Sequence, residues 1–394
     1  MIKKTLVDVE VKGLKVLVRV DFNVAMEGNL VVDDSRITAS LPTIQYLVDQ
    51  GARVILCSHL GRPDGRVVPN LSLHPVADHL SRLLGRNVFF VEDCIGPEVV
   101  AIVKQLCPGD VMLLENLRFY PEEEMNDASF AASLASVADL FVNDGFGVAH
   151  RAHSSTEGVT HYLPSVAGFL MGRELDILGS LLDSPKKPLV LVMGGAKISD
   201  KIGVLENLLD KIDTILIGGG MAATFLKAHG VYVGNSIIEE ELVGYSKRIT
   251  SLAKSKGISL LLPLDVVVSK TFGEDGTSTG VDVNEIPEDW LIMDIGHRTL
   301  DTYRKEVVGA STVLWNGPMG VFEFSSFARG TKELGSTLAS LDECITVVGG
   351  GSTAEAVNML GISDKMTHVS TGGGASLEFL EGRSLPGVVA LQDK

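Results

Sequence analysis

Two kinds of chemically active residue follow the short apolar segments of this chain, and they are divided between its two halves. In the first half, acidic, histidine and arginine side chains come directly after such segments, as at Asp21, His59 and Arg118. In the second half, the same places hold lysine, as at Lys197, and glycine runs, as at residues 218–220. Arginine binds carboxylates and phosphates through its fork of N–H groups, and glycine-rich turns admit phosphate oxygens to backbone N–H groups. We therefore expect a different anionic ligand in each half.

The polar residues of the first half suit a small ligand with two separate anionic groups. Each taken alone has an ordinary explanation: Arg118 as an ion-pair partner, His59 as a loop or core histidine, and Asp21 as a turn cap. Ligands of open parallel sheets bind beyond the carboxyl ends of the strands, and these residues share that position. The shared position favours a binding site.

Glycine triplets at residues 218–220, 349–351 and 372–374 favour a nucleotide in the second half. One triplet would be an ordinary turn, but three precede helical patterns, where the helix dipole attracts phosphate. Lys197 and Lys201 lie four residues apart, on one face if a helix begins there; a solvated lysine pair is the alternative. The chain has neither a P-loop nor a G-x-G-x-x-G motif, so a different phosphoryl-transfer architecture is needed.

The elements that must position these residues alternate between strand and helix patterns in both halves. This alternation predicts an α/β protein with two doubly wound, Rossmann-like parallel-sheet domains. The predicted strands are residues 14–20, 53–57, 88–91, 111–114, 140–142, 189–193, 214–217, 259–262, 312–314, 345–348 and 367–370. The predicted helices are residues 41–50, 75–84, 128–138, 201–211, 221–229, 240–256 and 354–360.

A segment at residues 165–185 separates the two halves, and its apolar residues follow a helical rhythm. We expect an interdomain helix there, with a hinge near its two ends at Pro164 and Pro185. The expected domains are residues 1–164 and residues 186–379. Three glycines in the segment, Gly168, Gly172 and Gly179, either weaken the helix as a rigid rod or permit close packing.

Composition restricts the class of function. The chain has 394 residues and a formal net charge of -16, which argues against nucleic acid or an anionic membrane as the main partner. It has no secretory signal pattern and no apolar run of membrane-spanning length. Its four cysteines form no Cys-x-x-Cys pair or zinc spacing, which favours reduced thiols and a cytoplasmic location. They are Cys57, Cys94, Cys107 and Cys344.

Eight stretches in this order resemble the phosphoglycerate kinase family over nearly the whole chain. The resemblance implies reversible phosphoryl transfer from 1,3-bisphosphoglycerate to ADP, giving 3-phosphoglycerate and ATP, with Mg2+, in glycolysis and gluconeogenesis. It also implies a monomer with small-molecule partners only, and a tail from about 380 to 394 that packs back on the first domain. The stretches are VRVDFNV (18–24), SHLGRP (58–63), LLENLRFYPEEE (113–124), VNDGFGVAHRAHSSTEGV (142–159), GGAKISDKI (194–202), IGGGMAATF (217–225), LWNGPMGVFE (314–323) and STGGGASLEFLEG (370–382).

The resemblance also implies a role for each candidate site residue. Those that would hold the phosphoglycerate are Asp21, Phe22, Asn23, Arg36, His59, Leu60, Gly61, Arg62, Arg118 and Arg151. Those that would hold the nucleotide are Gly194, Ala196, Lys197, Lys201, Gly218, Gly219, Gly220, Asn316, Pro318, Glu323, Gly350, Gly351, Ser352 and Thr353. Those that would act on the transferring group are Arg36, Lys197, Lys201, Gly372 and Gly373.

One residue departs from the family pattern where the metal is concerned. Ser352 stands where the family usually has an aspartate that helps to hold the metal-nucleotide, so the residues that bind Mg2+ stay unassigned. A serine hydroxyl still offers Mg2+ an oxygen, directly or through water.

Two other functions are possible alternatives to the kinase. One is a two-lobed binding protein without chemistry, which is disfavoured because such proteins are usually exported and this chain has no secretory signal pattern. The other is a dinucleotide-dependent oxidoreductase, which is disfavoured because the G-x-G-x-x-G fingerprint is missing.

Overall fold

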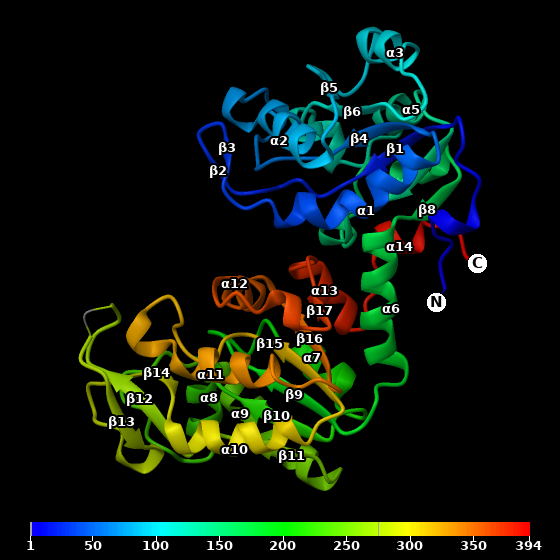
Figure 1. The fold of residues 1–394 in the computed structure, drawn as a ribbon. Helices are drawn as coiled ribbons and strands as arrows, with labels where there is room; N and C mark the ends of the chain where they lie inside the picture. The colour runs from blue at the N-terminus through cyan, green and yellow to red at the C-terminus, as the bar shows by residue number, and fades with distance from the viewer. Residues whose placement is uncertain (1, 275) are drawn as a thin grey trace. The chain divides into compact units, whose positions relative to one another are not determined.

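A computed structural model describes residues 2–274 and 276–394, and its backbone contacts divide the chain into two compact units (Figure 1). Unit 1 contains the chain up to Gly179 and the tail Ser384–Lys394, and unit 2 is Ser180–Arg383. Each unit is built on a six-stranded parallel sheet, which confirms the predicted α/β class. Within the described residues, no helix is long and apolar enough to cross a membrane.

The sheet of unit 1 has the strand order β5-β6-β4-β1-β7-β8, all parallel. The strands that follow β1 in the sequence lie first on one side of it, beginning with β4, and later on the other side, beginning with β7. The carboxyl ends of β4, β1 and β7 are therefore neighbours at the point where the strand order reverses. The strands are β1 (Lys15–Arg19), β4 (Arg53–Cys57), β5 (Val88–Val91), β6 (Val111–Leu114), β7 (Leu140–Asn143) and β8 (Ser165–Ala167), with a small hairpin β2 (Met26–Glu27) and β3 (Leu30–Val31). The helices are α1 (Ser35–Asp49), α2 (His74–Leu84), α3 (Pro97–Val103), α4 (Pro121–Glu124), α5 (Ala128–Ala135) and, in the tail, α14 (Pro386–Val389).

Alternate residues of these strands enter two different hydrophobic cores, one on each face of the sheet. Val16 and Val18 of β1 pack in the core that includes α1 and α2. Leu17, between them, packs in the core that includes α3 and α5. Strands buried on both faces read as continuous apolar runs, which is why the sequence located them to within a residue or two.

The sheet of unit 2 has the order β11-β10-β9-β15-β16-β17, also parallel, and reverses between β9 and β15. Its strands are β9 (Leu189–Met193), β10 (Thr214–Ile217), β11 (Ser259–Leu261), β15 (Thr312–Asn316), β16 (Ile345–Gly349) and β17 (His368–Val369). Its helices are α7 (Ile202–Leu208), α8 (Met221–Ala228), α9 (Glu240–Ser255), α10 (His297–Val308), α11 (Arg329–Leu338), α12 (Gly351–Met359) and α13 (Gly374–Leu380).

A second, three-stranded antiparallel sheet in unit 2 was not predicted. It has the order β13-β12-β14, with β12 at Asp265–Ser269, β13 at Thr279–Asp282 and β14 at Leu291–Ile295. The edge strand β13 is TGVD, half exposed, and carries no apolar alternation from which a strand could be predicted. Val266 and Val268 of β12 lie in a small hydrophobic core with Ile286.

The predicted helix at residues 165–185 is wrong at its amino-terminal end. Ser165–Ala167 form β8, which pairs with β7, and the helix α6 spans Phe169–Asp183. The apolar residue Val166 satisfies both a strand and a helix pattern, so periodicity alone could not separate them. The boundary between the two units falls within α6, after Gly179.

Candidate functional site

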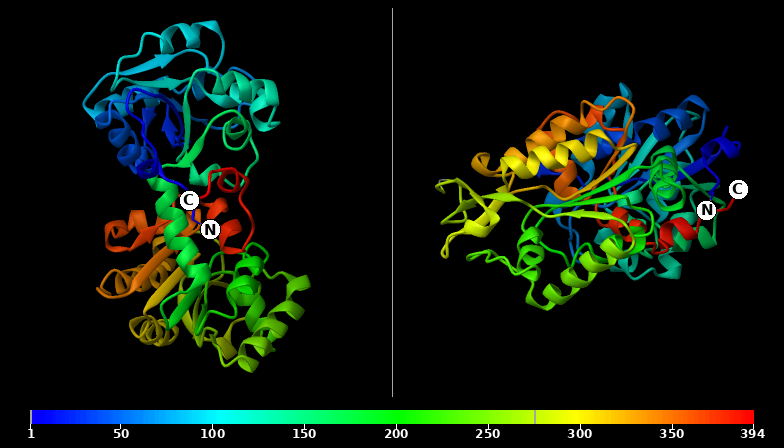
Figure 2. Two further views of the ribbon diagram at one scale, coloured as in Figure 1. Left: turned by 90° about the vertical axis from the view of Figure 1, so that its right-hand side faces the viewer. Right: turned by 90° about the horizontal axis from the view of Figure 1, so that it is seen from below.

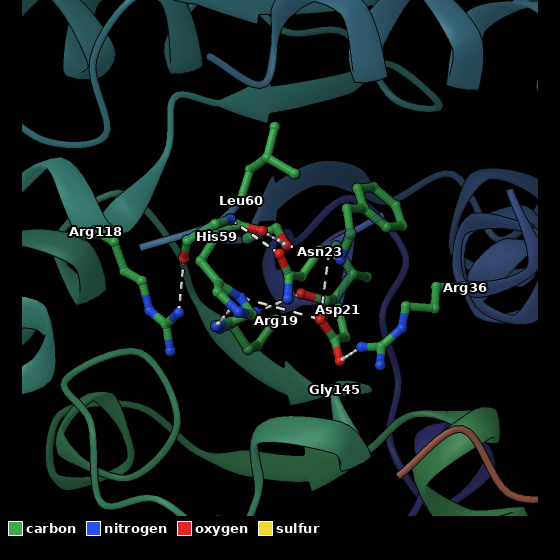
Figure 3. Close-up of polar contacts among 12 residues, drawn as sticks. Arg19, Asp21, Asn23, Arg36, His59, Leu60, Arg118 and Gly145 are labelled. Atoms are coloured by element: carbon green, nitrogen blue, oxygen red, sulfur yellow. Dashed lines mark hydrogen bonds and ion pairs between the residues drawn. The ribbon is translucent and has the colours of Figure 1, made fainter. Parts of the chain in front are cut away.

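The loops that follow β1, β4 and β6 bring Asp21, Asn23, His59 and Arg118 together at one edge of the unit 1 sheet (Figure 3). Arg36 forms an ion pair with Asp21. Because α1 begins at Ser35, six residues before its predicted start, Arg36 lies in the first turn of a helix that is itself packed in the core. Asn23 Oδ1 accepts a hydrogen bond of 2.9 Å from the backbone N–H of Gly61.

Arg118 is held from two sides. Its Nη1 donates to the carbonyl of Gly61 at 2.8 Å (Figure 3), and its Nε lies 3.1 Å from Glu124 Oε1. Burial lowers the pKa of Arg118, but a guanidinium stays charged in proteins. The site therefore keeps a fixed cation at this edge.

Arg19 is a functional candidate that the sequence analysis missed. It ends β1 and is 1% exposed, and its donors reach Ser155 Oγ at 2.8 Å, the carbonyl of Val20, and His59 Nδ1 at 3.2 Å (Figure 3). A charged residue at the end of an otherwise apolar parallel strand is the signal that could have identified it.

Arg19 determines which ring nitrogen of His59 carries the proton. A guanidinium can only donate, so Nδ1 of His59 must accept and the ring proton must lie on Nε2. Burial, followed by the positive charge of Arg19, holds the pKa of His59 well below its usual range. His59 is therefore a neutral N–H donor, suited to binding an anion and unsuited to removing a proton at neutral pH.

Beneath these residues lies a buried carboxylate. Glu123 is fully buried and accepts hydrogen bonds from Ser155 Oγ at 2.5 Å and from its backbone N–H at 3.0 Å. Burial raises the pKa of Glu123, and the charge of Arg19 opposes that rise. Burial also lowers the pKa of the neighbouring His153 to about 4, so His153 is neutral at pH 7. At neutral pH the fixed cations of this cluster are therefore its arginines and not its histidines.

Four predicted residues are placed differently from this cluster. Arg62 and Arg151 are exposed, and Arg151 Nε donates to His150 Nε2 at 3.2 Å. Phe22 and Leu60 are buried in the hydrophobic core, so their side chains cannot reach a ligand. Any contact that Phe22 or Leu60 makes with a ligand would come from main-chain atoms.

In unit 2, the loops after β9, β10 and β15 pack backbone against backbone, which explains many of their glycines. A Cβ atom on Gly194 would lie 2.0 Å from the carbonyl oxygen of Pro318, and one on Gly219 would lie 2.5 Å from the nitrogen of Gly195. The amides of Gly194 and Gly219 already donate to the carbonyls of Asn316 and Met319. The interpretation of these glycines as phosphate donors is wrong for those two amides, because both are used within the protein.

Lys201 lies beneath these loops. Its ammonium bonds to Asn316 Oδ1, and burial lowers the pKa of Lys201 to about 8. Asn316 is 1% exposed, and its Nδ2 is one of the buried side-chain atoms without a hydrogen-bond partner among the described residues. An unused donor next to a buried ammonium fits an anionic group.

A cavity of about 450 Å³ opens beside the glycine loops. Its polar side chains include Lys197, Glu323 and Ser352, and its other wall is apolar. The predicted residues that line it are Ala196, Lys197, Gly219, Gly220, Pro318, Glu323 and Ser352. The lining residues that the sequence analysis did not assign are Gly195, Ala223, Ser236, Ile237, Phe272, Leu291, Ile292, Met293, Gly320 and Val321.

The remaining predicted residues are not among those that line the cavity. Gly350 has φ +88° and precedes α12, whose first amides have no acceptor within the helix. Thr353 is buried, and its Oγ1 accepts from the backbone N–H of Gly317 at 2.7 Å. The other residues of this group are Gly218, Gly351, Gly372 and Gly373, the last with φ +53° before α13.

Comparison with known proteins decides the family. The family model described as phosphoglycerate kinase matches residues 6–383. The chain belongs to the phosphoglycerate kinase family. Curated phosphoglycerate kinases of Moorella thermoacetica and Dictyoglomus turgidum are 56% and 53% identical, over the full length of both chains in each case. The resemblance drawn from the eight motifs is confirmed.

Solved structures of phosphoglycerate kinases agree in fold. The enzyme from Coxiella burnetii aligns with a TM-score of 0.89 at 40% identity and covers 98% of each chain. The enzyme from Pyrococcus horikoshii aligns with a TM-score of 0.85 at 34% identity, covering 99% of this chain and 98% of its own. The architecture of two units, each built on a six-stranded parallel sheet, is thus that of the phosphoglycerate kinase family.

Proposed function

We propose that this chain transfers a phosphoryl group reversibly from 1,3-bisphosphoglycerate to ADP, giving 3-phosphoglycerate and ATP. The observation that carries the proposal is that the chain has two different anion sites. Unit 1 has a cluster of arginines, Arg19, Arg36 and Arg118, and unit 2 has a glycine-walled cavity beside two lysines. We assign phosphoglycerate binding to residues 1–164 with the tail from about 380, nucleotide binding to residues 186–379, and the connection to residues 165–185.

In unit 1, Arg36 and Arg118 would bind the anionic groups of the phosphoglycerate, with Arg62 and Arg151 added from the exposed rim. His59 would donate from Nε2, and Asp21 and Asn23 would position the ligand and the loop around it. Arg36 is half-buried and held by Asp21, so its charge is positioned before the ligand arrives. Fixed charges of this kind need little reorganisation during the reaction.

In unit 2, the cavity would hold the nucleotide, with the base against its apolar wall. Lys197, Lys201 and the free Nδ2 of Asn316 would contact phosphate oxygens, and the amides before α12 and at Gly372 and Gly373 would add to the positive potential. In phosphoryl transfer the charge spreads over the equatorial oxygens, so positioning and electrostatic stabilisation do most of the work. The acyl phosphate is a reactive donor, and no strong general base is required.

The residues of the cavity fit a magnesium nucleotide in which the phosphates supply most of the metal ligands. Among the described residues, no group of three His, Cys, Asp or Glu side chains could hold a metal ion. Mg2+ keeps several waters and usually binds through one or two protein oxygens plus substrate phosphates. Ser352 and Glu323 would offer those oxygens. When bound, the metal neutralises the charge that develops on the transferring phosphate.

Transfer requires donor and acceptor oxygens in line, yet the two ligands are assigned to different units. We propose that the units close on one another during the reaction and exclude water. We also propose a cytoplasmic monomer whose partners are its small-molecule substrates, without nucleic acid or membrane, consistent with the net charge of -16.

The direct test is ATP-dependent phosphorylation of 3-phosphoglycerate by the purified chain with Mg2+, followed through a coupled dehydrogenase. We expect turnover that depends on all three components. Folded protein that shows no turnover above the ATP hydrolysis background would refute the proposal.

A further inference from the structure

The loop that carries both lysines has no regular structure of its own. Residues 194–201, the lysine loop, connect β9 to α7. Lys197 is exposed in the nucleotide cavity, whereas Lys201 is buried. Two lysines in such a loop can act on one phosphate only if the backbone between them is fixed from outside.

Ile198 is the internal anchor of the lysine loop. Its side chain is fully buried, and its carbonyl accepts the backbone N–H of Lys201 at 2.8 Å. Ile198 also directly follows Lys197 in the chain. A displacement of the Ile198 backbone would therefore move both lysines.

The Ile198 backbone is held by a carboxylate from a distant part of unit 2. Glu239 Oε2 accepts the N–H of Ile198 at 2.5 Å, and both oxygens lie 3.4 Å from the nitrogen of Ser199. Glu239 occupies the position before α9, where the short side chain of Asp, Asn, Ser or Thr commonly caps the helix. Its side chain makes no such cap. The carboxylate is used on the lysine loop instead.

Glu239 is itself located by buried structure next to the cavity. Its backbone N–H donates to Oγ1 of Thr224, which is 1% exposed in α8, at 3.1 Å. Ser236 and Ile237, three and two residues earlier, line the nucleotide cavity. The same short segment thus forms a wall of the cavity and holds the lysine loop.

We propose that Glu239 is a positioning residue for phosphoryl transfer, which acts through the amides of Ile198 and Ser199 to hold Lys197 and Lys201 at the transferring group. This inference rests on the proposed function, since the roles of the two lysines do. Glu239 touches no substrate, and its effect is on the geometry of groups that do.

The test compares steady-state kinetics of Glu239→Ala and Glu239→Gln with the neighbouring Glu240→Gln. Glu240 is exposed and pairs with the surface Lys227, so it is a matched control for the loss of one carboxylate. We expect Glu239→Ala to lower kcat by about tenfold or more, because small misplacements of catalytic groups are costly. The KM for 3-phosphoglycerate should change by less than about twofold, since that ligand is assigned to unit 1.

Glu239→Gln keeps one carbonyl acceptor, so it should retain the fold and lose part of the rate even if Glu239→Ala unfolds. Hydrogen exchange at Ile198 and Ser199 should accelerate in both Glu239 variants, and not in Glu240→Gln. If kcat in Glu239→Gln equals that of the parent, the inference is wrong. It is also wrong if the variant has a raised KM for 3-phosphoglycerate together with a lower free energy of unfolding, because the effect would then be a general loss of structure.

A double-mutant cycle separates this inference from the proposed function. In a Lys197→Ala background, removing Glu239 should cost less in kcat than it costs in the parent, because one of the groups it positions is already gone. Equal costs in the two backgrounds would overturn the positioning role alone. If Lys197→Ala itself keeps the parent kcat, it is the lysine assignment in the proposed function that fails.

Discussion

At the scale of the residue, Lys201 shows how burial can tune one charge for an anionic ligand. Its pKa of about 8 is lowered from 10.5 by desolvation, so the free protein loses the Lys201 charge as the pH rises through 8. A bound phosphate favours the charged form and raises the pKa again. Nucleotide binding above pH 8 must then take up a proton.

We predict that the affinity for Mg-ADP falls as the pH rises from about 8 towards 10, by at most about tenfold per pH unit. Calorimetric titrations at pH 8.5 in two buffers of different ionisation enthalpy would measure the proton uptake. Lys201→Gln should abolish the uptake, and the exposed Lys247→Gln should preserve it. Proton uptake that persists in Lys201→Gln would place the titrating group elsewhere.

Ser352 raises a second question at this scale, because it offers the metal-nucleotide a hydroxyl in place of a carboxylate. It lies in the first turn of α12 and lines the cavity. A carboxylate there would attract Mg2+ and interact favourably with the helix dipole. We expect Ser352→Asp to lower the Mg2+ concentration needed for half-maximal rate. An unchanged or higher requirement, measured at fixed ATP, would show that the protein holds the metal elsewhere.

Residue types at strand ends were enough to predict Asp21, His59 and the lysines as candidates, whereas Arg36 was assigned only from the resemblance to the family. Arg19 and Glu239 were not found, because their importance comes from tertiary contacts. Arg19 reaches His59 from 40 positions away, and Glu239 reaches Ile198 from 41. A single sequence contains no pattern that pairs such distant residues.

At the scale of the element, α6 depends on one buried carboxylate at its amino-terminal end. Asp144 Oδ1 accepts the N–H groups of Leu170 and Met171, and a Cβ on Gly168 would lie 2.1 Å from that oxygen. Gly179, near the carboxyl-terminal end of α6, faces open space. Gly168, just before α6, and Gly179, within it, therefore serve different purposes, and close packing is the purpose of Gly168.

We predict opposite effects from two identical substitutions in this segment. Gly168→Ala should displace Asp144 and destabilise the chain by about 1–3 kcal/mol. Gly179→Ala should stabilise it by about 0.5–1 kcal/mol, because alanine is the better helix former and meets no neighbour. Urea unfolding midpoints would measure both. A Gly168→Ala variant as stable as the parent would contradict the packing role of that glycine.

The same contrast explains what could be predicted of the elements. Strands buried on both faces, such as β4 and β9, were predicted with their observed bounds because an apolar run has no other explanation there. β8 and the antiparallel β13 were missed, since three or four residues of mixed polarity fit several structures equally well.

At the scale of the whole molecule, the tail completes unit 1. In both views of Figure 2 the two ends of the chain lie side by side. The backbone N–H of Lys4 donates to the carbonyl of Gln392, and Lys3 Nζ binds the carbonyl of Leu391 at 2.8 Å. Leu385, Val388 and Leu391 are at most 4% exposed. Each buried apolar side chain contributes about 1.5–3 kcal/mol.

We predict that a chain ending at Arg383 loses the fold of unit 1 at lower urea concentration than unit 2. Both tryptophans, Trp290 and Trp315, lie in unit 2, so their fluorescence reports that unit alone. Circular dichroism should therefore fall before tryptophan fluorescence changes. Removal of Lys394 alone, which pairs with Asp8 at the surface, should leave the two signals as they are in the parent. Coincident, unshifted transitions in the truncated chain would show that the tail is dispensable.

Under the proposed function, each unit binds its own ligand, 3-phosphoglycerate in unit 1 and Mg-ADP in unit 2. The most direct measurement is calorimetric titration of 3-phosphoglycerate and of Mg-ADP, separately, into Arg36→Ala, with the exposed Arg66→Ala as the control. We predict that Arg36→Ala weakens 3-phosphoglycerate binding by about tenfold or more, as expected for the loss of a charge-assisted contact, and leaves Mg-ADP affinity unchanged. Unchanged 3-phosphoglycerate affinity, or an equal loss of affinity for both ligands, would contradict the assignment of the two ligands to different units.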